Sequence, residues 1–564
     1  MNSFLIRLID ICAAAVGLII GTPLLLLLCL IGFFDTGWPI YRQIRLGRNQ
    51  TPFVMWKFRT MRRGTDSLPT HLVDPSAITP IGKILRKTKL DEVPQLWNVL
   101  KGEMSLVGPR PCLPNQTELI QEREERGVFA VRPGVTGLGQ VRNVDMSKPV
   151  ELAELDQEMI DNFRLIDYFK LILMTAMGGG RGDAVKESHR RVYLSSPHMS
   201  GYEMPMIREA FLTNWIGPVG PHLSAFEQEI AHLTGTRYAV AVSSGTAALH
   251  LILRALGIGP GDLVLCSDFT FVASVTPIRF QGAEPVFIDS ETISWNLDPE
   301  LLEECIDDLK KKQQKPKALI LVHLYGQSAN IEPIKSICER ENILLIEDAA
   351  EALGATYQGK APGSFGKAGF ISFNGNKIIT TSGGGMVITD DEELARQVRF
   401  LAFQARDPGL SYEHSVVGYN YTMSNVLAGI GRGQLKVLPK RVTQRRTIFN
   451  YYAEALHDLP GITLMPEAPW GICTRWLSCV LFDPDQGAPE RNQVIELLEQ
   501  HNIESRPLWK PMHQQKVFAG VPFYGRGVSD HLYAKGLCLP SSTHLTKEDQ
   551  KRIIRLIRGI SPGS

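Results

Sequence analysis

Hydrophobic and polar positions follow three different patterns along the chain. Residues 11–34 form a run without a single charge, long enough to enter or cross a bilayer as a helix. Residues 36–180 alternate short amphipathic stretches with glycine- and proline-rich turns, which predicts short helices and loops. After residue 196, apolar runs of strand length alternate with helical stretches, a pattern typical of an α/β domain with a largely parallel sheet. The strands expected there include residues 238–244, 262–266, 318–324 and 343–350.

The uncharged run differs from a cleaved signal sequence. It is longer than a typical signal core, and no small-residue cleavage site follows it. Pro23 removes a backbone donor in the middle of the run, and Thr22 can bond to a carbonyl left free, so we expect a kinked helix. Two topologies remain open from these residues: a re-entrant helix, or a straight spanning helix that tolerates its proline.

At 564 residues the chain is too long for one ordinary domain. A stretch rich in glycine and charge, GGGRGDAVKESHRR, has no apolar period and reads as a linker. The expected organisation is a membrane helix, a first catalytic domain, a linker, a large domain and a small domain, at residues 1–35, 36–180, 181–195, 196–440 and 441–564.

Composition narrows the classes of partner. A formal net charge of +1 gives no indication of nucleic acid binding. Residues 36–101 carry twelve Lys or Arg against four Asp or Glu, which fits a surface that meets anionic lipid and diphosphate. Nine cysteines without CxxC spacing indicate reduced, mostly buried thiols in a cytosolic setting.

Asp91 and Glu92 are the first candidate catalytic residues. Adjacent side chains do not share a helix face, so one carboxylate can face the substrate while the other faces a divalent cation such as Mg²⁺. A carboxylate can attack a phosphoryl group and split one transfer into two steps. An isolated Asp-Glu pair is more often a solvated helix start, so the surrounding sequence decides.

That sequence resembles the monotopic phosphoglycosyl transferases, bacterial enzymes that move a sugar 1-phosphate from a UDP-sugar onto undecaprenyl phosphate. The matching blocks, in order, are RLGRN, KFRTM, TPIGKILRKTKLDE, VGPRP and RPGVTGLGQV. The resemblance implies a re-entrant helix, Asp91 as nucleophile, and Mg²⁺ held by Asp91 and Glu92. It also implies that four basic residues lie near the substrate phosphates: Lys57, Arg86, Arg110 and Arg132. The chain departs from the family at 140–143, where a longer motif is shortened, and at Leu138, where an aromatic residue is usual.

A second set of residues lies in the α/β part. Gly245 and Thr246 follow an expected strand and open a helix whose free N–H groups would hold a phosphate. Asp348 ends a buried strand, where a protonated ring nitrogen would be a suitable partner. Lys377 lies between a Ser-Phe pair and a glycine run, and its amine could bind a cofactor aldehyde and later move a proton. Taken singly, each has an ordinary alternative: Asp348 could be a helix cap, Lys377 a surface charge, and the glycines part of a hairpin.

Their order resembles the DegT-type sugar-nucleotide aminotransferases, which have the aspartate aminotransferase fold and use pyridoxal 5′-phosphate. The matching motifs are SSGTAALH, SDFTFVASV, VHLYG, EDAAEALGA, SFNGNK, GYNYTMSN and RPLWKPMH. The resemblance implies that Phe271 stacks on the pyridine ring and that Ser372 joins the phosphate site. It also implies that Glu351 faces the ring hydroxyl and that Asn420 reaches the cofactor of a second subunit, hence a homodimer.

Two histidines in matching motifs, His323 and His513, have two open readings. Each could touch the substrate, or each could be a structural histidine whose ring nitrogens are satisfied inside the protein.

The sequence therefore predicts a bifunctional enzyme of glycoconjugate biosynthesis at the bacterial inner membrane, monotopic, with its catalytic domains cytoplasmic. One half would transaminate a UDP-4-keto-6-deoxy-HexNAc with glutamate, as in a bacillosamine pathway. The other would transfer a phospho-sugar from a UDP-sugar to undecaprenyl phosphate and release UMP. A membrane-anchored aminotransferase whose first domain is only a scaffold is the alternative. A cofactor-sensing regulator is a third reading, but it would need a DNA-binding segment, which we do not find in the sequence.

Overall fold

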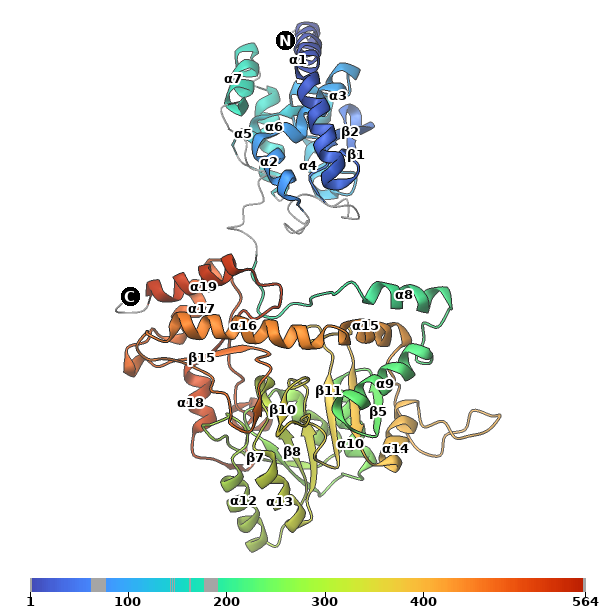
Figure 1. Cartoon of the computed structure of the whole chain (residues 1–564), viewed down its shortest axis with the longest axis vertical. Helices are drawn as coiled ribbons and strands as arrows, with labels where there is room; N and C mark the ends of the chain where they lie inside the picture. Colours follow the sequence, from blue (N-terminus) through green and yellow to red (C-terminus); the bar gives the residue numbers. More distant parts are fainter. Residues whose placement is uncertain are drawn as a thin grey trace. The chain divides into compact units, whose positions relative to one another are not determined.

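The computed structural model describes residues 3–61, 78–142, 144, 146, 148–161, 164–176 and 191–560. The chain divides into two units, Met1–Arg190 and Arg191–Ser564 (Figure 1). The last residues of the expected linker, 191–195, belong to the second unit. Each unit is described by itself.

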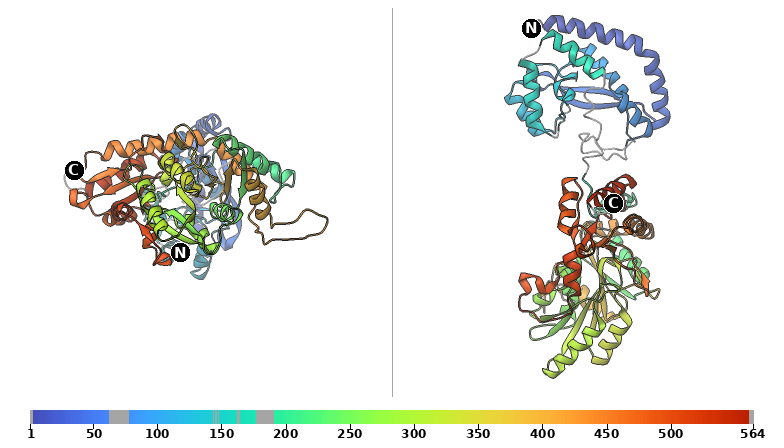
Figure 2. Two further views of the ribbon diagram at one scale, coloured as in Figure 1. Left: turned by 90° about the horizontal axis from the view of Figure 1, so that it is seen from below. Right: turned by 90° about the vertical axis from the view of Figure 1, so that its left-hand side faces the viewer.

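Helix α1 (Ser3–Thr36) forms the long apolar element of the first unit. Pro23 lies inside it, and the Thr22 hydroxyl donates to the Leu18 carbonyl at 2.7 Å. In the right-hand view of Figure 2, α1 changes direction near its middle, as expected where a proline removes a backbone donor. By its length and composition, α1 could cross a membrane. Most of its apolar side chains are exposed and would be available to lipid.

Two polar residues attach α1 to the rest of the unit. The Arg7 guanidinium donates to the carbonyls of Val99 and Leu100, at 2.7 and 2.9 Å. These carbonyls lie at the end of α3 (Leu96–Lys101), where helix carbonyls lack partners of their own. Asp10 is buried and accepts bonds from the Tyr168 hydroxyl, at 2.6 Å, and the Leu106 amide, at 2.9 Å.

Short elements make up the remainder of the first unit. Strands β1 (Ile40–Leu46) and β2 (Pro52–Phe58) form an antiparallel hairpin, while β3 (Ser105–Val107) and β4 (Gly134–Thr136) pair in parallel. Around them lie α2 (Pro80–Thr88), α4 (Thr117–Glu125), α6 (Pro149–Asp161) and α7 (Leu165–Ala176).

An eight-stranded mixed sheet forms the centre of the second unit, in the order β17-β7-β6-β8-β9-β11-β12-β5. Neighbours from β17 to β11 are parallel, and β12 pairs antiparallel with both β11 and β5. The core strands are apolar on both faces because helices cover both sides of the sheet. The strands are β5 (Tyr238–Val242), β6 (Leu263–Ser267), β7 (Glu284–Ile288), β8 (Pro316–Val322), β9 (Leu344–Asp348), β11 (Ala368–Ser372), β12 (Gly385–Thr389) and β17 (Phe523–Tyr524). The fold class expected from the sequence is confirmed.

A smaller four-stranded antiparallel sheet forms the second layer, in the order β13-β15-β18-β16. Helix α16 (Leu438–Leu456) spans residue 440, where the sequence suggested the domain boundary, and α19 (Lys547–Ile560) packs against it. The sheet consists of β13 (Ile462–Leu464), β15 (Ser478–Phe482), β16 (Arg506–Pro507) and β18 (Gly536–Leu539).

One strand from the last third of the chain joins the large sheet. β17 pairs in parallel with β7 at its edge, with Phe523 opposite Phe287 and Tyr524 opposite Ile288. After this strand, the amides of Arg526, Gly527 and Val528 donate to the Asp289 carboxylate at 2.8 to 3.0 Å. The two lobes of the second unit are therefore joined by backbone hydrogen bonds as well as by the chain.

Candidate active sites

Asp91 lies in a tight turn of the first unit. Helix α2 ends at Thr88, Lys89 takes a left-handed conformation with φ 57°, and the 3₁₀ helix η4 (Leu90–Gln95) follows. This turn brings Asp91 and Glu92 against strand β2, which carries Lys57. Asp91 is 9% exposed, so its carboxylate is mostly removed from water.

Glu92 is held by two cations. Lys57 Nζ lies 2.8 Å and an Arg110 terminal nitrogen 3.3 Å from the same carboxylate oxygen, Oε1. Burial acts to raise the pKa of Glu92, but Lys57 and Arg110 outweigh it and lower the pKa to about 2. Glu92 is thus a carboxylate at neutral pH.

Asp91 behaves in the opposite way. Burial, only partly opposed by the charge of Lys57, raises the pKa of Asp91 to about 6, and the neighbouring Glu92 charge adds to the rise. Arg86 and Arg110 act to lower it. Adjacent titratable groups whose pKa values are pushed apart are typical of groups with different roles in one reaction.

The four basic residues expected near substrate phosphate occupy two places. Lys57, Arg86 and Arg110 surround the acidic pair, and the Arg86 Nε donates to the Thr60 hydroxyl at 2.9 Å. Arg132 instead donates to the Gly102 carbonyl, at 2.9 Å, just beyond the end of α3.

Sequence reasoning missed two arginines that hold the Gly-Pro-Arg-Pro segment. The Arg123 guanidinium, paired with buried Asp156 at 2.6 Å, donates to the Arg110 carbonyl at 2.8 Å. Arg45 donates to the Pro111 carbonyl at 3.0 Å. Because proline lacks an N–H, this segment has few donors of its own. Burial in the structure identifies these arginines, whereas in the sequence they look like surface charges.

The acidic pair offers few ligands for a metal ion. Within the described residues, no group of three or more His, Cys, Asp or Glu side chains could enclose a metal ion. Asp91 and Glu92 supply two carboxylates, which suits Mg²⁺ only where water and substrate phosphates complete its octahedral shell. The Mg²⁺ site therefore stays a prediction.

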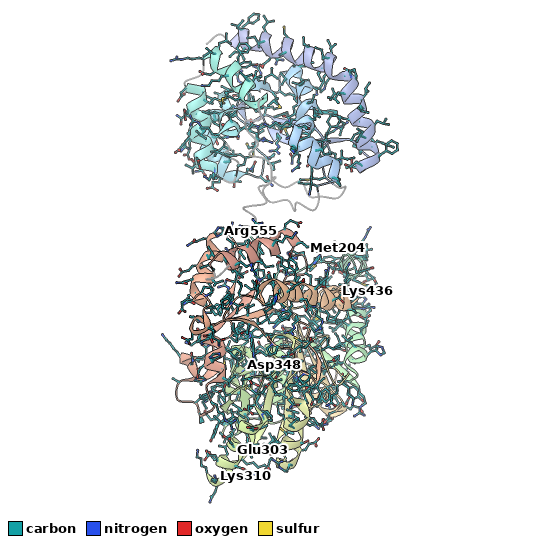
Figure 3. All side chains as sticks on the ribbon, turned by 60° about the vertical axis from the view of Figure 1, so that its left-hand side comes forward. Met204, Glu303, Lys310, Asp348, Lys436 and Arg555 are labelled. Carbon is teal, nitrogen blue, oxygen red and sulfur yellow. The ribbon has the colours of Figure 1, made fainter. Side chains whose placement is uncertain are left out.

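Asp348 is the central residue of the second candidate site. It ends β9 and lies in the interior of the second unit (Figure 3). Its carboxylate accepts bonds from the Ser274 hydroxyl, at 2.7 Å, and the Ala350 amide, at 3.0 Å. Burial raises the pKa of Asp348, with these bonds and Lys377 acting against the rise. A buried carboxylate of this kind gains from a cationic partner.

Lys377 approaches the same region from the loop after β11. Its Nζ lies 3.5 Å from a Glu351 carboxylate oxygen and 4.2 Å from the centre of the Trp476 ring. The other Glu351 oxygen accepts the Tyr325 amide at 2.8 Å. Burial raises the pKa of Glu351, and Lys377 opposes this. The amine is thus held between a carboxylate and an aromatic face.

The start of α10 (Gly245–Ala255) is shaped to accept a phosphate. Ser244 caps the helix, and a Cβ added at Gly245 would lie 3.1 Å from the Ser372 Cβ, so only glycine fits this close approach easily. Gly245 and Ser372 therefore lie side by side, and Thr246 follows Gly245 in the first turn of α10. The residues present fit a pyridine ring that carries a phosphate: helix amides, a buried carboxylate and a lysine amine.

Two expected cofactor residues are open on one side. Phe271 is 48% exposed, with its ring centre 5.1 Å from that of Trp509. Asn420 is exposed and bridges to Phe403 at the base of a segment that extends away from the body between α14 and α15 (Figure 1). Helix α14 is Glu392–Ala402 and α15 is Asn425–Leu435.

His323 and His513 both bond to protein groups through their rings. His323 is fully buried; its Nε2 bonds to Glu347 at 2.9 Å and its Nδ1 accepts the Ala329 amide at 3.2 Å. His513 bonds to Asp268 at 2.8 Å through Nδ1 and lies 3.1 Å from Asp530 through Nε2. Both ring nitrogens of each histidine therefore have protein partners, which favours the structural interpretation.

Comparisons with known proteins agree with this division. Residues 197–558 match the DegT/DnrJ/EryC1/StrS aminotransferase family, and residues 1–180 match the bacterial sugar transferase family. The chain is 48% identical to EpsN of Bacillus subtilis (strain 168) over 373 residues, which is 65% of this chain and 95% of EpsN. It is 38% identical to the GDP-perosamine synthase of Caulobacter vibrioides (strain ATCC 19089 / CIP 103742 / CB 15), over 64% of this chain and 96% of that one.

A solved structure extends the agreement to the fold. A DegT DnrJ EryC1 StrS aminotransferase from Brucella abortus superposes with a TM-score of 0.60 and 29% identity, over 64% of this chain and 96% of that one. The chain therefore belongs to the DegT/DnrJ/EryC1/StrS aminotransferase family, and it carries a bacterial sugar transferase segment ahead of its aminotransferase unit.

Proposed function

We propose that the chain is a bifunctional transferase that makes an amino sugar and loads a phospho-sugar onto a lipid carrier. The acceptor of the amine would be a UDP-4-keto-6-deoxy-HexNAc, with glutamate as donor. The lipid would be undecaprenyl phosphate, with release of UMP. Support for a nucleotide-sugar substrate comes from the similarity to GDP-perosamine synthases.

In the second unit, the observation that carries the proposal is a buried carboxylate, Asp348, with the Lys377 amine close enough to act on its pKa and 3.5 Å from Glu351. Pyridoxal phosphate, when bound, supplies the electron sink for amine transfer. Asp348 would hold a proton on the ring nitrogen, while Gly245, Thr246 and Ser372 would bind the phosphate. Phe271 would cover the ring, and Glu351 would face its hydroxyl. The Lys377 amine would then move the proton at the reacting carbon, with Glu351 3.5 Å away to stabilise its charge.

In the first unit, the carrying observation is a buried Asp91 next to Glu92, whose carboxylate contacts Lys57 at 2.8 Å and Arg110 at 3.3 Å; the opposite pKa shifts of the two carboxyls agree with different roles. The Asp91 carboxylate would attack the sugar-bearing phosphorus of the UDP-sugar, and the P–O bond to UMP would break. The lipid phosphate oxygen would then displace Asp91 from the same phosphorus. Lys57, Arg86 and Arg110 would offset the phosphate charge; Arg132, which donates to the Gly102 carbonyl, stays a fourth candidate for phosphate binding.

Mg²⁺ at Asp91 and Glu92 is proposed as a binding partner, with no step assigned to it. Removal of divalent cations with EDTA should abolish UMP release, and added Mg²⁺ should restore it. Unchanged UMP release in EDTA would show that the basic residues alone neutralise the phosphates.

The membrane and dimer assignments are also proposals. The exposed apolar surface of α1 supports attachment to a membrane; the inner membrane, the monotopic topology and the cytoplasmic side for both units are part of the proposal. Helix α8 (Glu203–Leu212) and the residues after it expose Phe211, Leu212 and Trp215, a surface that suits a second copy of the aminotransferase unit. If Asn420 completes the partner's site, mixing Lys377→Ala and Asn420→Ala proteins should restore part of the activity that each lacks.

Two substitutions test the activities separately. UDP-sugars are screened for UMP release with undecaprenyl phosphate and Mg²⁺, and absorbance of the purified protein with pyridoxal phosphate is recorded. Asp91→Ala should abolish UMP release and keep the absorbance band, whereas Lys377→Ala should lose the band and keep UMP release. An Asp91→Ala protein that still releases UMP would support the scaffold alternative.

A further inference from the structure

The peptide bond between Asn376 and Lys377 is held by two hydrogen bonds to its carbonyl oxygen. The carbonyl of Asn376, the preceding residue, accepts two hydrogen bonds: one from the Trp476 Nε1 at 2.8 Å and one from the Ser195 hydroxyl at 2.7 Å. The two donors lie 100 residues after and 181 residues before Asn376 in the sequence. A carbonyl that accepts two directed bonds has little freedom to rotate.

Trp476 contacts Lys377 in a second way. Its side chain is 1% exposed, and the Lys377 Nζ lies 4.2 Å from the centre of its ring. An ammonium over an indole face is attracted by the ring's electrons. The same indole therefore fixes the backbone before the lysine through its N–H and the end of the lysine side chain through its face.

A buried arginine joins the two donors. Arg445, on α16, donates to the Trp476 carbonyl at 2.8 Å and to the Ser195 hydroxyl at 2.9 Å, and is 2% exposed. The Ser195 hydroxyl accepts from Arg445, so its own hydrogen is directed at Asn376. Burial, with Arg441 adding to the effect, lowers the pKa of Arg445 to about 9. Holding a guanidinium in this dry position is costly, so the arrangement needs its hydrogen bonds to persist.

Ser195 belongs to the first residues of the second unit. Val192 pairs with Ile503, and the Leu194 amide donates to Glu504 at 3.1 Å. The Ser196 amide donates to the Ser542 hydroxyl at 2.8 Å. The segment is thus fixed on the small lobe by backbone bonds on both sides of Ser195.

We propose that Ser195 and Trp476 are positioning residues for Lys377, acting through the Asn376 carbonyl, and that Arg445 sets the direction of the Ser195 hydroxyl. This inference rests on the proposed aminotransferase function. It assigns the first residues of the second unit, which include Ser195, a role in positioning the lysine of the amine-transfer site.

The test measures how fast the full-length apo-protein takes up pyridoxal phosphate, followed by its absorbance band, and the pH at which that band changes. Ser195→Ala and Trp476→Phe each remove one donor to Asn376, and Trp476→Phe keeps an aromatic face under the lysine. Each should slow uptake roughly fivefold, the effect of one net hydrogen bond, and shift the pH midpoint of the band. Ser195→Thr keeps the hydroxyl and should restore the wild-type rate.

Ser541→Ala is the matched control. Ser541 is a fully buried serine on the same lobe, whereas Ser195 is half-buried; the Ser541 hydroxyl donates to the Leu539 carbonyl at 2.7 Å and accepts from the Ser478 amide at 2.8 Å. It should leave the uptake rate and the pH midpoint unchanged. Wild-type uptake and midpoint in both Ser195→Ala and Trp476→Phe would overturn the inference, as would equal defects in Ser195→Ala and Ser195→Thr. A wild-type protein that never develops the band would instead overturn the proposed aminotransferase function.

Discussion

At the scale of single residues, neighbouring carboxylates acquire opposite acidities from their contacts. Burial raises the pKa of Asp91 more than its basic neighbours lower it, whereas Glu92 contacts Lys57 and Arg110 directly and its pKa is lowered. The sequence indicated both residues and their basic neighbours, because the motif is contiguous. It could not indicate which carboxylate would be the easier to protonate, since that depends on Lys57, which folding brings in from strand β2.

This difference predicts stability changes of opposite sign. The pKa of Asp91 is raised from 3.8 to about 6, so its contribution to stability is present below pH 3.8 and is lost as pH rises through 6. At pH 7.5, Asp91→Asn should therefore raise the free energy of unfolding by up to about 3 kcal/mol. Asp161→Asn, an exposed site on α6, is the control.

Glu92→Gln should do the reverse. The pKa of Glu92 is lowered from 4.5 to about 2, so its contribution is present above pH 4.5 and is lost as pH falls through 2. At pH 7.5 the substitution should lower the free energy of unfolding by about 3 kcal/mol. Urea unfolding in detergent at pH 7.5 measures both variants; equal signs would contradict the assigned pKa directions.

At the scale of elements, buried polar contacts fix helices that the apolar pattern only outlines. The sequence predicted short helices between residues 36 and 180, and α4 and α6 are two of them. Their joining ion pair, Arg123 with Asp156, was not foreseen, because a pattern of exposed charges looks the same whether or not two of them meet. The same pair reaches the Arg110 carbonyl, so helix packing and the acidic site are linked.

The Arg123–Asp156 pair predicts a non-additive result. Asp156→Leu alone leaves a buried guanidinium without its carboxylate and should cost about 3–5 kcal/mol of unfolding free energy. Arg123→Leu/Asp156→Leu removes both charges and should recover most of that loss. Because the double variant also releases the Arg110 carbonyl, its rate of UMP release should stay low. Additive losses in a double-mutant cycle of urea unfolding would contradict this.

Helix α1 gives a prediction about topology. Pro23→Ala restores a donor to the Ile19 carbonyl and should straighten the helix, which would move its N-terminus across the bilayer. A cysteine at Ser3, with Cys12 and Cys29 replaced by serine, should become accessible to an impermeant maleimide from the periplasmic side. Leu24→Ala is the control. Labelling that is periplasmic before the Pro23 change would contradict a re-entrant helix.

At the scale of the whole molecule, the two units have separate hydrophobic cores among the described residues. The sequence foresaw this division because the apolar pattern changes at the glycine-rich stretch. It also singled out Asp348 and Lys377 as candidates from local motifs, and the structure places Asp348 at the end of β9 and Lys377 in the loop after β11. Ser195 and Trp476 were missed because their neighbours come from distant parts of the chain, and nothing local distinguishes them from ordinary core residues.

Separate cores predict that residues 191–560 fold alone. Produced without the first unit, this part should be soluble without detergent and should develop the pyridoxal phosphate absorbance band. If covalent linkage raises the local concentration of intermediate, the fused chain should form lipid-linked sugar faster than an equimolar mixture of the two units. Equal rates would show that the linkage has no kinetic role.

Strand β17 bears on how the chain can be shortened. Its few residues cover the rim of β7, whose backbone groups would otherwise meet water and the rims of other molecules. A chain truncated before residue 523 lacks β17 and leaves the edge of β7 unpaired. Such a truncated protein is expected to aggregate in the cell, although it contains every residue attributed to cofactor binding.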